Sequence, residues 1–435
     1  MRRLIPSLLA LSCALVVTSV PAQAQELAAV IADALAQAPP LEAAQAGEAA
    51  AQARLDRAMA ERNPLLRVEG SIGTGRIDNN GFFGIAPAGV TPLAVQASSE
   101  VPLYTGGRLS AAIGQARGGA DMARSGTEQA RLQTIVQAVA AYAELLTARK
   151  LEARYDQLAS ELTEIVRQAD LRFRAGEIAS SDLAQARARQ AEGLAGLAQA
   201  QGRRRSAEAA FRQMTGKPAA DLAPLPPLPA TPPTFDEALD RARQSNPALR
   251  QARSAVTTAE AGLRGARAEA LPTVGAFAEG SHLRDQFFPG YRADAVTVGV
   301  RGRWTLWSGG RVAAQTRVAS AELDGAQAQL RQADQVLEGL VIDAWQGLAT
   351  ARRMVEASRL RRDAAAEALR GTQLESKVGA KPMLAVLDAE REAIEAEAVL
   401  LDSEGRQTVA AWQLNALSGA IAADLIGEPR TPKEN

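Results

Sequence analysis

Hydrophobic residues recur at three- and four-residue steps through two long stretches of the chain. One stretch runs between Pro102 and Pro218, the other between Pro289 and Pro382, and neither contains a proline. Such spacing places apolar side chains on one face of a helix. The residues that show it are Leu132, Ile135, Val136, Val139, Tyr142 and Leu145 in the first stretch and Leu337, Leu340, Val341, Trp345 and Leu348 in the second.

Each stretch is predicted to hold a very long helix, a turn and a second helix. Thr105 and Ser308 are suitable N-caps, and Gly176 and Gly379 suit the position just after a helix C-terminus. The bounded helices would contain roughly 70 residues and extend about 105 Å. Shorter helices before each hairpin and after each turn would stack end to end beside them. Helices of this length do not fit a compact globule.

Between the helices the hydrophobic pattern changes to a two-residue period. It predicts β-hairpins at about 65–104 and 273–307, in which Leu66, Val68 and Ile72, or Val296, Val298, Val300, Trp304 and Leu306, alternate with polar residues. One apolar and one polar face suit strands with lipid outside and water inside, although a sheet packed on a soluble core remains the alternative. Four strands cannot close a barrel with an aqueous lumen, so several chains would have to contribute.

The chain is internally duplicated. The segment Thr105–Arg108, with the sequence TGGR, reappears as SGGR at Ser308–Arg311, an offset of 203 residues. Upstream of the hairpins the offset is 208 residues, so the first copy has five extra residues between Pro64 and Gly106. The predicted organisation is a first copy at 25–216, a proline-rich linker at 217–234, a second copy at 235–419 and a C-terminal tail at 420–435.

The N-terminus predicts export from the cytoplasm. Two arginines precede a mostly apolar run from Leu4 to Val20, and Ala22-Gln23-Ala24 supplies the small residues of a cleavage site. Residues 1–24 are therefore interpreted as a signal peptide. The alternatives are a membrane anchor, for which the run is short, and lipid attachment at Cys13. No later run of about 18 apolar residues predicts a spanning helix, so a membrane would have to be crossed by strands.

Composition argues against several classes of protein. The chain has 49 basic and 49 acidic residues, a single cysteine, and His282 as its only histidine. A neutral chain is a poor nucleic-acid partner, and one imidazole leaves almost no material for His-ligated metals or a Ser-His-Asp relay. We expect no catalytic residues, no metal and no cofactor. A hydrolase using paired carboxylates is a distant alternative, because nothing places two acids at a fixed separation.

The duplicated plan and two strand-to-helix signatures resemble the TolC family of outer-membrane efflux proteins. The signatures are Leu103–Arg108 and Leu306–Arg311, and Asn246–Leu249 resembles the start of the second copy. The resemblance implies a homotrimer with a twelve-stranded barrel in the outer membrane and a helical tunnel across the periplasm. It also implies docking to a periplasmic adaptor and an inner-membrane transporter, with the channel as a passive exit duct for efflux or type I secretion. The rival interpretation is a periplasmic adaptor or helical scaffold.

The resemblance also points to the turns between the paired helices. Arg174, Ala175, Gly176 and Glu177, and in the second copy Lys377, Val378, Gly379 and Ala380, look like the family's adaptor-binding tip. Taken alone, a glycine between two helices is only a hairpin turn. The equal distance of each turn from its Gly-Gly pair favours the functional interpretation.

Beyond the second turn, Leu387-Asp388-Ala389 resembles the segment that lines the family's constricted tunnel entrance. Three symmetry copies of Asp388 would surround one axis, raise one another's pKa and attract cations. A second acidic residue common in the family is replaced by Ala385, which weakens the expected ring. Lys381 is placed to pair across the closed entrance. Both charges could instead be ordinary solvated residues. The duplication offset maps Asp388 onto Gln185, and Asp182 is expected in the outer layer.

Charged residues of the predicted hairpins are assigned to the barrel lumen, with a position at the lipid headgroups as the alternative. They are Arg67, Glu69, Arg301 and Arg303. His282 is expected at a loop or strand end without chemistry. Two aromatic pairs, Phe82-Phe83 and Phe287-Phe288, fall in the predicted hairpin loops, where they would suit the outer leaflet or an extracellular contact.

Overall fold

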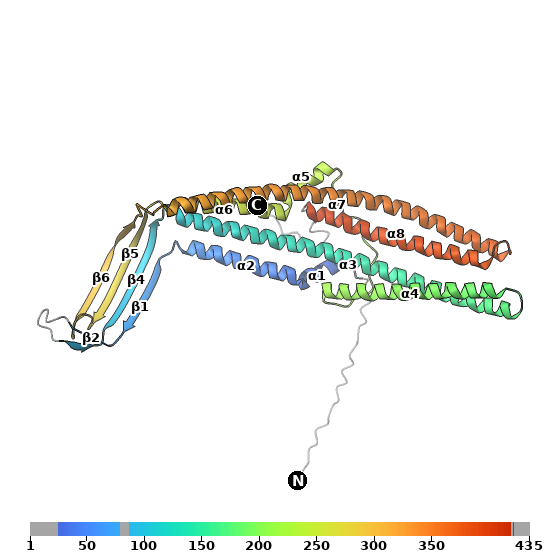
Figure 1. Ribbon diagram of the computed structural model, residues 1–435, viewed down its shortest axis with the longest axis horizontal. Helices are drawn as coiled ribbons and strands as arrows, with labels where there is room; N and C mark the ends of the chain where they lie inside the picture. Colours follow the sequence, from blue (N-terminus) through green and yellow to red (C-terminus); the bar gives the residue numbers. More distant parts are fainter. Residues whose placement is uncertain (1–24, 79–86, 419–420, 422–435) are drawn as a thin grey trace, which may run out of the picture.

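Two helices of 67 residues each, α3 (Arg108–Arg174) and α7 (Arg311–Lys377), run along most of the molecule. The structure is a computed structural model that describes residues 25–78, 87–418 and 421. The chain is elongated: helices make up most of its length, and a β-sheet lies at one end (Figure 1). The predicted length and number of the long helices are confirmed. The predicted signal peptide, Cys13 and Phe82-Phe83 lie outside the described residues.

Glycines, rather than the predicted hydroxyl residues, cap the starts of the long helices. The N-caps are Gly107 and Gly310, with φ of 90° and 83°. The prediction of Thr105 and Ser308 was wrong because the chain needs two left-handed residues to turn from strand to helix, which glycine adopts readily. The hydroxyl oxygens of Thr105 and Ser308 still accept a hydrogen bond from the backbone N–H four residues later, at 3.3 and 3.5 Å.

Shorter helices flank each long one. In the first copy they are α1 (Leu27–Gln37), α2 (Pro39–Ala60) and α4 (Ser180–Thr215); in the second they are α5 (Phe235–Ser245), α6 (Pro247–Ala268) and α8 (Met383–Leu417). Figure 1 shows α2 and α4 in line beside α3, and α6 and α8 in line beside α7. Helix α3 also packs on α6 and α8. The helices therefore lie side by side in the order α2/α4, α3, α6/α8, α7, and we call this layer the wall.

The main sheet has four antiparallel strands in the order β1-β4-β5-β6. They span β1 (Leu65–Ile72), β4 (Leu93–Tyr104), β5 (Thr273–Arg284) and β6 (Arg292–Arg303). A small second sheet of β2 (Gly75–Ile77) and β3 (Ala88–Val90), not predicted, lies in the longer first hairpin. The prediction that Trp304 and Leu306 belong to a strand was wrong. Arg303 pairs with Thr273, the first residue of β5, so no partner remains beyond it.

The main hydrophobic core lies where α1 and the linker cover α3. Tyr142 is fully buried there, together with Ile31, Phe211 and Trp412. Its hydroxyl donates to the carbonyls of Gln25, at 3.0 Å, and Ala223, at 2.6 Å, which ties the start of the first copy and the linker to the middle of α3. A second core forms where α5 covers α7 and α8. Among the helices that the structure describes, none combines the length and apolarity needed to cross a membrane.

Candidate functional site

One face of the four-stranded sheet is apolar and uncovered. The strand register aligns Val68, Ala97, Gly280 and Val296 in one row across the sheet. Val298 belongs to the neighbouring row on the same face. The valines of β6 are among the most exposed large apolar residues, at 85% for Val296 and 76% for Val298. A contiguous aliphatic surface of this kind requires a covering of lipid or protein.

The opposite face of the sheet carries charged side chains. The register places all four residues predicted for the lumen on this face: Arg67, Glu69, Arg301 and Arg303. The guanidinium of Arg301 lies 2.7 Å from a carboxylate oxygen of Glu279 and 4.3 Å from the ring centre of Phe277. The sheet therefore separates an apolar surface from a polar one, as a barrel wall does.

Both edges of this sheet are open. Strands β1 and β6 each have one hydrogen-bonded neighbour within the described residues. Unpaired edge strands present rows of N–H and C=O groups that pair readily with another chain. Near the end of the sheet farthest from the helices, the Nδ1 of His282 in β5 lies 2.5 Å from a carboxylate oxygen of Asp294 in β6. In the adjoining loop, Phe287 and Phe288 pack edge-on against Tyr291.

The two turns between paired helices have the same geometry, at the end of the molecule opposite the sheet (Figure 1). Gly176 and Gly379 both have φ of 78°. In each turn the N–H of the residue after glycine donates to the carbonyl five residues earlier, at 2.9 and 2.8 Å, which is a Schellman motif. The eight residues predicted for the tips all lie in or beside these turns, and Val378 is 80% exposed.

The two residues predicted for the tunnel entrance have different partners within the chain. Asp388 lies on α8, and a carboxylate oxygen is 2.9 Å from a guanidinium nitrogen of Arg189 on α4. The ammonium of Lys381 lies 2.6 Å from Glu375 of its own helical hairpin. Arg189 was missed because spacing along one helix does not reveal which side chain of a neighbouring helix lies opposite.

Further ion pairs join the two helical hairpins along α3 and α8. Arg154 on α3 lies 2.7 Å from Glu397 on α8, and Arg203 on α4 bridges Glu144 and Asp402 at 2.7 and 2.8 Å. The hydrogen bond from Arg203 holds the pKa of the Glu144 carboxyl below its usual value. These contacts connect residues that are far apart in sequence.

Two carboxyl groups also meet between these hairpins. Burial, and then the nearby carboxyl of Glu161 on α3, raise the pKa of Glu390 on α8 to about 8. Protonated Glu390 donates to Glu161, which lowers the pKa of Glu161. The arrangement is stable while the two carboxyl groups share one proton. When both are ionised, the two carboxylates repel each other. Within the described part of the chain, no cluster of three or more His, Cys, Asp or Glu side chains could hold a metal ion.

Comparison with known proteins identifies the family. The sequence profile of the family described as Outer membrane efflux protein matches residues 30–217 and again residues 238–420. The chain belongs to the outer membrane efflux protein family. The double match confirms the internal duplication. This efflux protein is 30% identical to the outer membrane efflux protein BepC of Brucella suis biovar 1 (strain 1330) over 296 residues. That alignment covers 68% of the chain and 65% of BepC, slightly under two thirds of that relative.

Solved structures show the same fold. The efflux protein superposes on the Campylobacter jejuni CmeC outer membrane channel with a TM-score of 0.79 at 15% identity, covering 91% of this chain and 85% of CmeC. It superposes on the open state of the Neisseria gonorrhoeae MtrE outer membrane channel with a TM-score of 0.74 at 21% identity, covering 93% and 91%. The predicted mainly helical, duplicated fold with a membrane β-sheet is confirmed.

Family membership also gives the location of the efflux protein. The family is one of outer membrane efflux proteins, so the chain is placed in the outer membrane, extending into the periplasm. The uncovered apolar face of the sheet is the part of this chain suited to lipid.

Proposed function

We propose that this efflux protein is the passive exit duct of a tripartite efflux or type I secretion system, leading from the periplasm to the exterior. The observation that carries the proposal is a sheet with one uncovered apolar face, one charged face and two open edges, continued by helices of about 100 Å. A periplasmic adaptor or scaffold in water would not leave this apolar surface bare.

The open edges suit closure by copies of the same chain. Strand β6 of one subunit would pair with β1 of the next, and three four-stranded sheets would form a twelve-stranded barrel. The face with Arg67, Glu69, Arg301 and Arg303 would then line the lumen. Helix α7 of one subunit would pack against α2 and α4 of its neighbour and complete the tunnel wall. The proposed domain boundaries are the two copies at 25–216 and 235–419, the linker at 217–234 and the tail at 420–435, after removal of residues 1–24.

The helical tips suit contact with a periplasmic adaptor, which would link the duct to an inner-membrane transporter that supplies the energy. The turns at Gly176 and Gly379 are exposed, similar in shape and farthest from the sheet. A homotrimer would present six of them in a ring. Two similar turns per chain would allow one adaptor surface to dock twice on each subunit.

Conduction tests the duct directly. Purified full-length protein reconstituted in planar bilayers should form discrete conducting pores, because the assembled barrel would enclose water. Folded trimers, verified by size and by circular dichroism, that leave the bilayer insulating would contradict the proposal. Val298→Arg on the apolar face should impair membrane insertion at a cost of about 2–4 kcal/mol, whereas Thr297→Arg on the opposite face should insert normally.

The entrance is proposed to include Asp388 and Lys381. Asp388→Ala should lessen any block of conductance by divalent cations added on the periplasmic side, because the carboxylates would surround the axis. The change should be modest because Arg189 already offsets the charge of Asp388 within the chain. Asp182→Ala, an exposed acid on α4, is the matched control. A block that is identical in wild type and Asp388→Ala would show that Asp388 does not line the constriction.

A further inference from the structure

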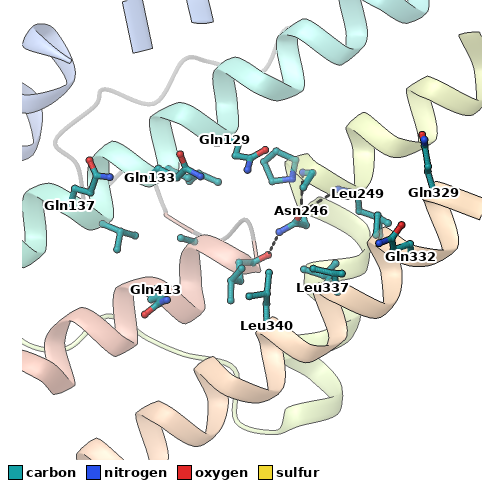
Figure 2. Close-up of a pocket in the computed structure, with 18 residues that line it drawn as sticks. Gln129, Gln133, Gln137, Asn246, Leu249, Gln329, Gln332, Leu337, Leu340 and Gln413 are labelled. Carbon is teal, nitrogen blue, oxygen red and sulfur yellow. Dashed lines mark hydrogen bonds between the residues drawn. The ribbon is translucent and has the colours of Figure 1, made fainter. Parts of the chain in front are cut away.

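A cavity of about 570 Å³ lies where the α6/α8 row of the wall is interrupted. Helix α8 ends at Leu417 and α6 begins at Pro247, so neither helix fills the space between α3 and α7 at this level. Figure 2 shows that the residues around the space come from all four helices. Its volume falls within the range of small-molecule sites in proteins.

The cavity is held open by hydrogen bonds at the helix junction. The side-chain oxygen of Asn246 accepts from the N–H groups of Ala248 and Leu249, at 3.0 and 3.3 Å, and so caps α6. Its amide nitrogen donates to the carbonyl of Leu417, at 3.1 Å, and fixes the end of α8 (Figure 2). Because both helix ends are fixed, the walls cannot collapse into the gap without breaking these bonds.

The lining of this cavity is uncharged. Apolar side chains contribute much of it, including Leu249, Leu337 and Leu340. The remaining polar lining consists of Asn246 and six glutamines, Gln129, Gln133, Gln137, Gln329, Gln332 and Gln413. Within the described chain, the side chains of these glutamines form no hydrogen bond. By contrast, a larger cavity bounded by α2, α3 and α6 carries several arginines and acids.

This lining determines the kind of occupant. An ionised ligand would lose hydration without meeting an opposite charge, which is costly. A neutral molecule can bury an apolar body against the leucines and satisfy its polar groups with the free amides, each of which can donate and accept. We propose that this cavity is a binding site for small, uncharged, amphipathic organic molecules in the wall of the duct. That such molecules are cargo rests on the proposed function; that they bind does not.

A matched pair of fluorescent probes tests the site. N-phenyl-1-naphthylamine is uncharged, whereas anilinonaphthalene sulfonate has the same ring system with an added negative charge. Titrated into the full-length protein held in amphipol, the neutral probe should show a saturable component, and the sulfonate should not. Gln332→Glu should weaken binding of the neutral probe about threefold, because it places a charge at the exposed rim of the cavity with little change of shape. Gln335→Glu, on the same helix but outside the lining, should leave it unchanged.

A second variant guards against an indirect effect of the new charge. Leu340→Trp should remove the saturable component by filling the cavity while keeping it neutral. The proposal is overturned if both cavity variants bind the neutral probe like wild type, or if the sulfonate binds equally well. It is also overturned if deleting residues 422–435 strengthens binding, because the tail would then be the natural occupant. Conductance in bilayers separates the two proposals. If Leu340→Trp conducts but does not bind the neutral probe, the binding site is supported and the duct is unaffected. If the wild type binds the probe but does not conduct, the proposed duct fails and the binding site stands.

Discussion

The long helices α3 and α7 have the same length and corresponding positions in the duplication, but they differ in burial. Helix α3 contains 18 buried residues and α7 contains 8. Helix α3 packs on α2 and α4 on one side and on α6 and α8 on the other, whereas α7 packs on α6 and α8 and on the short α5. The duplication therefore repeats the elements but not their environment. One copy supplies an internal helix of the chain, and the other supplies a helix with one side uncovered within the chain.

The largest expected difference concerns a pair of corresponding aromatic residues. Tyr142 on α3 is fully buried and hydrogen-bonded, and burial raises its pKa to about 12, while Trp345 on α7 is half-buried. Tyr142→Ala should cost about 3–5 kcal/mol of folding stability, and Trp345→Ala about half as much. Thermal unfolding of the detergent-solubilised protein would measure both. Equal losses would show that the second copy is packed as tightly as the first once assembled.

A smaller effect should follow from charge on the free side of α7. Ile342 and Leu360 are 42% and 68% exposed, and their separation of five helical turns places them on one face. The double variant Ile342→Glu, Leu360→Glu should shift the protein from trimers to monomers in native mass spectrometry, with chain folding retained. The corresponding double variant with glutamine should assemble better, because it adds no charge. Undiminished trimers with glutamate at both positions would place the subunit interface elsewhere.

The smallest effect should appear between the hairpins as a dependence on pH. Glu390 has a folded pKa of about 8, above its usual value of 4.5, so the folded carboxyl keeps a proton that the unfolded chain releases. Its contribution to stability is therefore present below about pH 4.5 and is lost as the pH rises to 8. The pKa of neighbouring Glu161 shifts downward, away from this window, and the guanidinium of Arg154 also faces the pair.

Glu390→Gln should imitate the protonated state at every pH. The variant should match wild type near pH 5 and unfold a few degrees higher at pH 9 in thermal scans. Glu356→Gln, an exposed acid on α7, serves as the control. Parallel curves for wild type and Glu390→Gln between pH 5 and 9 would contradict the shared proton.

Several features followed from local sequence because each depends on neighbouring residues. The three- and four-residue steps predicted the long helices, and the two-residue period predicted the strands and the two faces on which Arg67 and Val68 lie. Gly176 and Gly379 marked the turns because positive φ strongly favours glycine. Predictions failed where a partner decided the outcome: Trp304 lies beyond the strand because β5 has no residue to pair with it.

The sequence by itself determined the duplication, the types of element and the alternation of apolar and polar faces, since periodicity and turn chemistry are short-range properties. Only the tertiary structure decided which side chains meet across elements. It paired Asp388 with Arg189, placed Glu390 beside Glu161, buried Tyr142 while leaving Trp345 half-exposed, and formed the neutral cavity at the α6/α8 junction. Such contacts join residues far apart in the chain, and they depend on the rotation and offset of whole helices, which no local pattern records.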